Sequence, residues 1–263
     1  MEQDFYREYY EAEGRHWWFL GRRRIFTAIL DRYFSPTRSP AQVLDYGCGT
    51  GTMVEHLSRY GESQGVDMSE DAVRFCHQRG LESVRRIEPD SLPFPEESFD
   101  LVTALDVIEH IDDDRRALRD LRRVLRPGGT LLVSVPAYRF LWGPQDEISH
   151  HKRRYVRKQL GELLVEAGFT LRRLSYFNTF LFPPIAAFRV LRPYRPGSRN
   201  LRSDLSLTKP GRLNSVLAAV FAAESRLLER FDLPFGVSIL GLATRDGGTP
   251  VEAPAPRREA TPV

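Results

Sequence analysis

Cysteine is scarce in this 263-residue chain: it occurs only at Cys48 and Cys76, too few for a disulfide scaffold and without the spacing of a zinc site. So few cysteines fit a reducing, cytoplasmic setting. The N-terminus lacks a basic segment followed by an apolar run, so the sequence predicts no signal peptide. The uncharged stretch 174–188 contains Pro183-Pro184 and is too short and too broken to predict a transmembrane helix.

The net charge of +3 conceals a strong asymmetry along the chain. Residues 1–151 carry 19 basic and 26 acidic residues, whereas residues 152–263 carry 19 basic and 9 acidic ones. Within 152–212 there are 14 basic and only 3 acidic residues. Such a block indicates an anionic partner, namely a phospholipid surface, a phosphorylated substrate or nucleic acid, unless it is an ordinary solvated face rich in arginine.

Short apolar runs alternate with amphipathic stretches from residue 42 onward. This alternation predicts an α/β fold with a doubly wound, mostly parallel seven-stranded sheet. The expected strands are 42–46, 63–67, 82–87, 99–105, 130–135, 170–177 and 236–244. The expected helices between them are 51–60, 69–79, 112–125 and 156–167, with a polar and aromatic loop over 137–155.

This pattern divides the chain into five parts. Residues 1–40 are expected to form an N-terminal helical segment or lid, and residues 41–177 the α/β core. Residues 178–235 form a helical insertion that either covers the substrate or contacts a membrane, and 236–245 form the last strand. Residues 246–263, rich in proline and without aromatic residues, are expected to be a disordered tail.

The most informative stretch is Val43–Gly51, with the sequence VLDYGCGTG. It predicts a strand, a tight turn through alternating glycines and the start of a helix, and glycine there lets the backbone approach a ligand. The spacing is not the dinucleotide fingerprint G-x-G-x-x-G, because Thr52 stands at its third glycine, and no lysine follows as in a P-loop. The candidate ligand-binding residues of this stretch are Asp45, Gly47, Cys48, Gly49 and Gly51.

Three further strand ends carry polar groups, and strand ends of an open α/β sheet meet at one edge. Asp67, followed by Met68, offers a carboxylate for paired hydrogen bonds to a ribose diol, or a cap for the next helix. The run Asp90-Ser91-Leu92 offers a polar acceptor and an apolar face to an adenine ring, although an aspartate alone is typical of a turn. After Leu105, the pair Glu109-His110 is either a capping element or the carrier of a general base.

Together these motifs resemble the class I S-adenosylmethionine (SAM) dependent methyltransferases across roughly residues 15–177. The succession includes VLDYGCGTG, GVDMS, DSLPFPEESFDLV, ALDVIEHI and LRRVLRPGGTLLVSVP, in the family's order and at its spacing. Within the superfamily, TALDVIEHI and the upstream His16-Trp17-Trp18 most resemble the quinone-biosynthesis type of small-molecule O-methyltransferase. The resemblance implies a Rossmann-like methyltransferase fold and SAM as the cofactor.

The resemblance also implies roles for individual residues. Gly47 and Asp67 are expected to contact the cofactor, and Leu105 to contact it at the end of the fourth strand. An arginine before the glycine turn holds the cofactor carboxylate in the quinone-biosynthesis group, and here we assign Arg23, between Arg22 and Arg24. Candidates for a cation–π contact with the sulfonium, or for core packing instead, are Trp17, Trp18 and Tyr138.

A hydroxyl acceptor would need a base, and histidine is suited to that role near neutral pH. The candidate bases are, in order, His110, His151 and His150. The candidate substrate-binding residues are Trp142, Arg153, Arg154 and Tyr155, because an arginine in this segment suits a phosphate or carboxylate. Asp106, Glu109 and His110 are of the types that bind metals, but the sequence indicates no preorganised site, so we predict none.

We therefore predict a cytoplasmic SAM-dependent methyltransferase that acts on a small molecule at a hydroxyl oxygen. An amphipathic or lipid-linked acceptor, and peripheral contact with an anionic membrane at its inner face, fit the basic and apolar C-terminal region. One alternative is a non-catalytic SAM-binding or membrane-associated partner protein. An RNA methyltransferase is the other, but we expect no nucleic-acid partner, because the chain lacks an N/D-P-P-Y/F motif, a catalytic cysteine after proline and an RNA-binding module. The sequence leaves the oligomeric state open.

Overall fold

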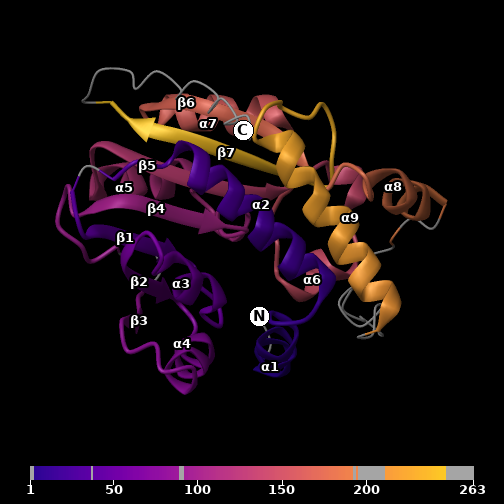
Figure 1. The fold of residues 1–263 in the computed structure, drawn as a ribbon, viewed down its shortest axis with the longest axis horizontal. Helices are drawn as coiled ribbons and strands as arrows, with labels where there is room; N and C mark the ends of the chain where they lie inside the picture. The colour runs from indigo at the N-terminus through magenta and orange to yellow at the C-terminus, as the bar shows by residue number, and fades with distance from the viewer. Residues whose placement is uncertain (1–2, 37, 89–91, 192–193, 195–210, 247–263) are drawn as a thin grey trace, which may run out of the picture.

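Seven strands of the described residues form one central sheet with the order β3-β2-β1-β4-β5-β7-β6 (Figure 1). The computed structural model describes residues 3–36, 38–88, 92–191, 194 and 211–246. The strands are β1 (Ala41–Tyr46), β2 (Gly61–Asp67), β3 (Val84–Arg86), β4 (Phe99–Leu105), β5 (Leu125–Pro136), β6 (Phe169–Phe177) and β7 (Ser238–Arg245). Neighbours from β3 to β5 pair in parallel, and β7 runs antiparallel to β5 and β6. The predicted seven-stranded, mostly parallel sheet is confirmed.

Helices cover both faces of this sheet. On one face, α2 (Trp17–Tyr33) and α9 (Arg212–Leu228) lie side by side, in front of the strands in Figure 1. On the opposite face lie α5 (Asp114–Val124) and α7 (Arg157–Glu166). The other described helices are α1 (Gln3–Ala12), α3 (Thr52–Leu57), α4 (Glu70–Gln78), α6 (Pro144–Ile148) and α8 (Phe182–Leu191), with single turns η1 (Ile108–His110) and η2 (Arg139–Leu141).

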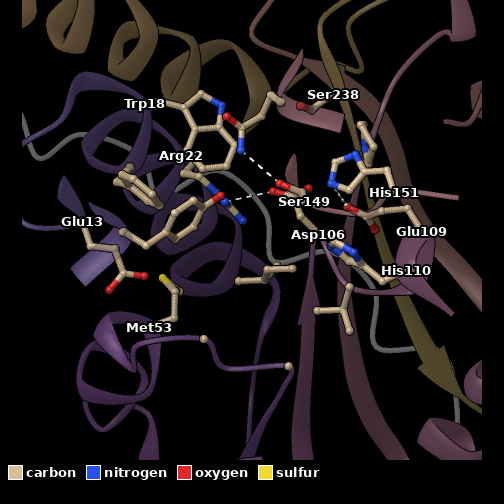
Figure 2. Close-up of a pocket in the computed structure, with 18 of the residues that line it drawn as sticks. Glu13, Trp18, Arg22, Met53, Asp106, Glu109, His110, Ser149, His151 and Ser238 are labelled. Carbon is tan, nitrogen blue, oxygen red and sulfur yellow. Dashed lines mark hydrogen bonds and ion pairs between the residues drawn. The ribbon is translucent and has the colours of Figure 1, made fainter. Parts of the chain in front are cut away.

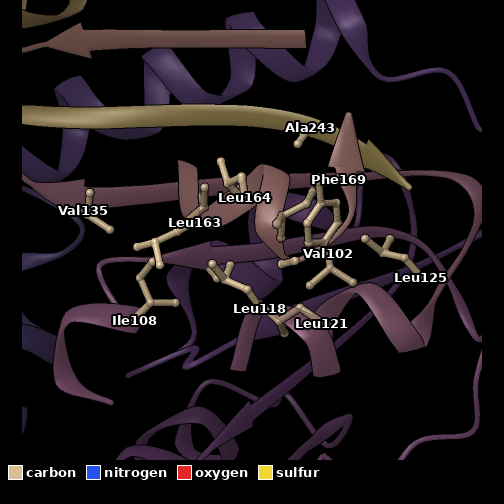
Figure 3. Close-up of a cluster of buried hydrophobic side chains, with 14 of the residues drawn as sticks. Val102, Ile108, Leu118, Leu121, Leu125, Val135, Leu163, Leu164, Phe169 and Ala243 are labelled. Atoms are coloured by element: carbon tan, nitrogen blue, oxygen red, sulfur yellow. The ribbon is translucent and has the colours of Figure 1, made fainter. Parts of the chain in front are cut away.

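Alternating strand residues build a separate core on each face of the sheet. Val102 of β4 belongs to the cluster that contains Leu118 of α5 and Leu164 of α7, drawn in Figure 3. The preceding residue, Leu101, belongs to the cluster on the side of α2 and α9. Successive strand residues point to opposite faces, so a strand buried on both faces reads as a continuous apolar run. Five of the seven residues of β4 are apolar and all but the last are buried, which explains why the strand was predictable.

The segment 137–155 differs from its predicted loop because it contains the short helix α6. Pro144 occupies the first turn of this helix, where its missing N–H leaves no hydrogen bond unmade. Asp146 accepts a hydrogen bond of 2.7 Å from the backbone N–H of Gly143, which fixes the start of the helix. The loop prediction is wrong here because α6 has only five residues, too few for a helical periodicity to be visible.

The carboxyl ends of the parallel strands meet at one edge of the sheet. The strands β1 and β4 are neighbours there, although the chain continues from them in opposite directions along the sheet. Open α/β sheets bind ligands at such a switch point. Because β7 is antiparallel, its first residue, Ser238, lies at the same edge and pairs with Pro136 and Phe177. This edge therefore gathers residues from both halves of the chain.

Candidate active site

A cavity of about 780 Å³ opens at this edge of the sheet (Figure 2). Its volume lies within the range typical of small-molecule sites. Strand ends line it from below, and side chains of α1, α2 and α8 line it from the sides. We call the part lined by residues 45–49 and 66–68 the glycine-turn side, and the part lined by 105–107, 109–111 and 149–152 the histidine side.

The glycine turn has the conformation that its sequence predicts. Gly47 has a φ of +71°, and a Cβ there would lie 2.5 Å from a methyl carbon of Val107. Gly49 has a φ of +54°, but a Cβ there would meet no atom within 4 Å, since the residue borders the cavity. The first glycine is therefore required by packing, and the second leaves open space where a ligand could approach the backbone.

Asp67 connects the glycine turn to the next helix. One carboxylate oxygen accepts a hydrogen bond from the backbone N–H of Gly49, and the other from that of Ser69, each at 2.9 Å. Burial nevertheless raises the pKa of Asp67 above its usual value. The carboxylate lines the cavity and holds the turn at the same time. The ribose contact expected of it remains a prediction.

The other predicted cofactor residues fall into three groups. Asp45, Cys48, Met68 and Leu105 line the cavity. Gly51 and Leu92 do not: a Cβ on Gly51 would meet Leu81 and Cys76, and Leu92 is packed in the core next to the sheet. Asp90 and Ser91 lie outside the described residues, and Ile87 lines the cavity in that region instead. The adenine contact expected of Leu92 therefore has no support from its position.

Asp45 is buried at the end of β1 and carries a perturbed carboxyl group. It accepts a hydrogen bond of 2.5 Å from the Thr103 hydroxyl. Burial raises the pKa of Asp45 to about 7, although this hydrogen bond and the nearby Arg22 oppose the rise. The side chain therefore belongs to the rigid floor of the cavity.

An N-terminal contact that the sequence analysis did not find closes the glycine-turn side. Glu13, which follows α1 and is 8% exposed, accepts hydrogen bonds from the hydroxyls of Thr50 and Thr52. The Arg79 guanidinium pairs with the same carboxylate at 3.2 Å and lies 4.2 Å from the ring centre of Tyr10. The end of α1 and the residue after it thus pack directly on the glycine turn.

Among the three arginines expected to include a cofactor ligand, Arg22 has the central position. Its guanidinium lies 2.9 Å from Asp106 and 4.2 Å from the ring centre of Trp18, and Figure 2 shows it pointing into the cavity. Arg23 is half-buried at the margin of the cavity, and Arg24 is exposed. The geometry therefore favours Arg22 over the predicted Arg23, by a shift of one position along α2.

The histidine side brings together three potential ligands or bases. The rings of His110 and His151 are 4.7 Å apart, and His151 Nε2 lies 3.9 Å from Glu109 Oε1. Burial, together with the neighbouring His151, lowers the pKa of His110 to about 4, so the ring is neutral near pH 7. His150 also borders the cavity, but it is exposed and has a φ of +55°. Two of the three predicted bases thus lie together, and the third lies at the rim.

Of the four predicted substrate-binding residues, only Arg154 lines the cavity. The Trp142 indole N–H donates to Glu147 at 2.8 Å. Arg153 and the Tyr155 hydroxyl both donate to Asp114, at 3.0 and 2.8 Å.

Arg154 itself donates to both carboxylate oxygens of Asp146, at 2.7 and 2.9 Å. All three nitrogens of Arg154 are bound, two by Asp146 and one by the Ala137 carbonyl oxygen, and Arg153 does not line the cavity, so the predicted anion-binding role of the two residues gains no support from the geometry.

Apolar residues far from the glycine turn in sequence complete the cavity. Leu181, Pro184, Ile185 and Phe188 of α8 and the turn before it line one wall, and Leu217 of α9 adjoins them. The uncharged composition of residues 174–188 was the only sequence signal for this wall. None of the described helices is both long and apolar enough to span a membrane. One face of α8 therefore lines the cavity, and another part of the helix faces outward.

The sequence was compared with models of known protein families. A family model described as a methyltransferase domain matches residues 44–133, which run from the glycine turn through β4 into β5. The core of this chain, residues 44–133, is therefore similar to the methyltransferase domain family.

Curated relatives share the methyltransferase core with this chain. It is 37% identical to the uncharacterized methyltransferase YcgJ of Bacillus subtilis, over 53% of this chain and 59% of the relative. It is 29% identical to norajmaline N-methyltransferase of Rauvolfia serpentina, over 48% of this chain and 46% of the relative. For a ubiquinone biosynthesis O-methyltransferase of Idiomarina loihiensis the identity is 26%, over 56% and 68%. The chain spans about half the length of the first two relatives.

Solved structures of the superfamily agree in fold over most of the chain. A SAM-dependent methyltransferase of Thermotoga maritima matches with a TM-score of 0.55 at 20% identity, covering 92% of this chain and 98% of the other. The Haloferax volcanii methyltransferase in complex with Trm112 matches with a TM-score of 0.57 at 18% identity, covering 91% and 93%. These matches confirm the Rossmann-like methyltransferase fold, and at such identities they show the fold alone.

Proposed function

We propose that this chain is a SAM-dependent methyltransferase that transfers a methyl group to a hydroxyl oxygen of a small molecule. One observation carries the proposal: a single cavity joins the glycine turn and Asp67 to two histidines and a buried glutamate on the opposite side. The relatives include both N- and O-methyltransferases by name. The unprotonated ring of His110 at this end of the cavity supports an oxygen acceptor, because a neutral imidazole nitrogen can accept a hydrogen bond from a hydroxyl.

The residues on the glycine-turn side fit SAM. The open space at the missing Cβ of Gly49 lets the methionine portion approach the backbone, and the Arg22 guanidinium suits its carboxylate. Asp67 retains free lone pairs beside its two amide contacts, and these suit a ribose diol. When bound, SAM supplies an electrophilic methyl group whose transfer leaves a neutral thioether, so the protein need not protonate the leaving group.

The acceptor is expected to be amphipathic. The apolar residues of α8 and α9 would contact its hydrocarbon part, while Glu109, His110 and His151 surround its hydroxyl. The outward face of α8 is apolar as well, since Val190 and Leu191 are 67% and 80% exposed. This exposed patch beside the cavity supports a lipid-linked acceptor taken up from a membrane surface, with the protein bound peripherally.

Calorimetric titration with SAM, S-adenosylhomocysteine and NAD tests the cofactor assignment. We expect micromolar binding of both adenosyl ligands and none of NAD. Methyl transfer from labelled SAM to pools of phenolic and lipid-linked alcohols then tests the acceptor class. Tight SAM binding without turnover on any pool would instead favour the non-catalytic partner protein, and salt-sensitive RNA binding with RNA methylation would favour the RNA enzyme. Absence of SAM binding by folded protein would refute the proposal.

A further inference from the structure

Three side chains on the histidine side are placed as ligands of one metal ion. Glu109 and His110 come from the single turn η1 after β4, and His151 comes from the segment after α6. One donor atom from each residue can be chosen so that all three lie within 4.8 Å of one another. Figure 2 shows the three side chains converging beside Asp106 at the edge of the cavity. Their meeting depends on tertiary packing, since the histidines come from separate segments.

Glu109 is the member of this cluster that most needs a partner. Its side chain is 0% exposed, and neither carboxylate oxygen has a hydrogen-bond partner among the described residues. The nearby cations do not supply one, because Arg22 pairs with Asp106 and Arg154 with Asp146. A buried carboxylate without a partner is costly, and proteins retain it where a ligand completes its contacts.

Both histidines are oriented in the manner of metal ligands. His151 Nδ1 lies 2.8 Å from Asp146 Oδ1, which leaves Nε2 directed toward Glu109. Asp146 is in turn fixed by two hydrogen bonds from Arg154. The backbone of Ser149 makes a hydrogen bond with the His110 ring, which leaves the other nitrogen free. Metal-bound histidines use one ring nitrogen for a carboxylate or carbonyl and the other for the ion.

Asp106 does not belong to the ligand set, although it is close. One of its oxygens pairs with Arg22 at 2.9 Å, and the other accepts a hydrogen bond from Ser134 at 3.1 Å. The sequence analysis predicted no metal site, and the three residues of metal-binding type that it named, Asp106, Glu109 and His110, differ from this cluster, which contains His151 in place of Asp106. His151, which comes from a later segment of the chain, is held in place by Asp146 with Nε2 facing Glu109, an arrangement that the sequence did not reveal.

We propose that Glu109, His110 and His151 bind a divalent first-row transition-metal cation on the acceptor side of the cavity. Two imidazoles and one carboxylate suit such an ion, whereas Mg²⁺ prefers oxygen donors. Zn²⁺ holds these donors at about 2.0–2.2 Å, so a bound ion would draw the three groups somewhat closer together. Three protein ligands leave coordination positions open toward the cavity, as catalytic rather than structural sites do.

The ion would give the acceptor hydroxyl a binding position and a lower pKa. A hydroxyl oxygen bound to the ion loses its proton more readily, and the O–H bond then breaks with the proton passing to water. The two histidines would act as ligands in this arrangement, which replaces the expectation that one of them is the base. This chemical consequence rests on the proposed function, whereas the cation site itself does not.

Calorimetric titration of the full-length, tag-free and EDTA-treated protein with ZnCl₂ tests the site. We expect one Zn²⁺ per chain with micromolar or tighter affinity, and binding of MgCl₂ at least about 100-fold weaker. Glu109→Gln and His151→Gln should each weaken Zn²⁺ binding at least about tenfold, since each removes a ligand. His77→Gln is the matched control, because His77 lies on α4 with Nε2 3.1 Å from the Val84 carbonyl oxygen, and it should bind Zn²⁺ as the parent does.

A visible spectrum of the Co²⁺-loaded parent protein gives a readout that does not depend on the variants folding. We expect absorption bands of a four- or five-coordinate ion. Unchanged Zn²⁺ affinity in Glu109→Gln, or no Zn²⁺ binding at millimolar concentration by folded protein, would overturn the proposal. SAM is titrated separately, so protein that binds Zn²⁺ in this pattern but not SAM would refute the proposed function and support the cation site.

Discussion

The two sides of the cavity satisfy their polar groups in different ways. On the glycine-turn side the protein supplies the partners itself: Asp67 accepts two backbone N–H groups, and Glu13 is bound by two hydroxyls and an arginine. On the histidine side Glu109 is buried, and neither of its carboxylate oxygens has a hydrogen-bond partner among the described residues. Buried polar groups are normally hydrogen-bonded. The first side therefore has its carboxylates paired within the protein, whereas the second keeps a buried carboxylate without a hydrogen-bond partner in the part of the chain that the structure describes.

The largest expected effect concerns Arg22, which lies where the two sides meet. Arg22→Met should weaken SAM binding about 100-fold, because it removes a charged hydrogen-bond partner worth about 1.5–3 kcal/mol. Arg23→Met, one residue further along α2, should change the affinity less than about threefold. Calorimetry measures both, and thermal melts check the fold, since Asp106 loses its ion pair. A larger loss in Arg23→Met than in Arg22→Met would return the role to the predicted position.

A stability experiment tests what holds the apolar wall formed by α8, the turn before it and α9. Glu224 of α9 is 0% exposed and accepts a 2.7 Å hydrogen bond from the backbone N–H of Phe180, at the turn before α8. Glu224→Ala should lower the free energy of unfolding by about 1–3 kcal/mol, since it removes the buried acceptor of the Phe180 N–H. Arg226→Ala, on the exposed face of the same helix, should change it by less than about 0.5 kcal/mol.

Denaturant unfolding of both variants provides the measurement. The SAM affinity of folded Glu224→Ala should equal that of the parent, because the residue supports only the apolar wall. A large loss of SAM affinity would mean that the two sides are not independent.

The same difference explains what the sequence could predict. The glycine turn and Asp67 lie within a few residues of strand ends, so the alternating pattern and the edge rule placed them correctly at the cavity. The sequence analysis assigned the cofactor carboxylate to Arg23, whereas the geometry favours Arg22, because helical periodicity places a face but not which of three adjacent arginines points inward. The sequence could not predict that His151 lies close to Glu109, since their proximity depends on how the segment after α6 packs against η1.

The apolar wall illustrates the same limit. Its residues belong to α8 and α9, and no local motif relates them to the glycine turn. The contact of Glu13 with Thr50 and Thr52 was likewise invisible, because an isolated glutamate after a helix carries no signal. The fold and the glycine-turn side follow from local sequence patterns, whereas the histidine side and the apolar wall are formed by tertiary packing.

Asp67 tests whether rigidity on the glycine-turn side serves SAM binding. Asp67→Ala should weaken SAM binding by about 1–3 kcal/mol, the range for losing a charged acceptor, both directly and by releasing the Gly49 N–H. Asp71→Ala, on the first turn of α4, serves as the control and should leave the affinity within about threefold. Calorimetry at one temperature compares the two. Unchanged affinity in Asp67→Ala would exclude the ribose role.

The smallest expected effect comes from two glycine substitutions. They distinguish a loss of space for the ligand from a loss of stability through backbone strain. Gly49 and Gly80 have φ values of +54° and +81°, and an added Cβ would meet no protein atom within 4 Å at either position. Both alanine variants should therefore lose a similar stability, about 1 kcal/mol, from the left-handed conformation. Only Gly49 borders the cavity, so Gly49→Ala alone should also weaken SAM binding, by about tenfold, while Gly80→Ala binds it as the parent does. Thermal melts and SAM titrations of the pair measure the two effects separately. Equal SAM affinities in both variants would mean that the open space beside Gly49 is not where the ligand lies, and the cofactor would then have to be sought further toward the histidine side.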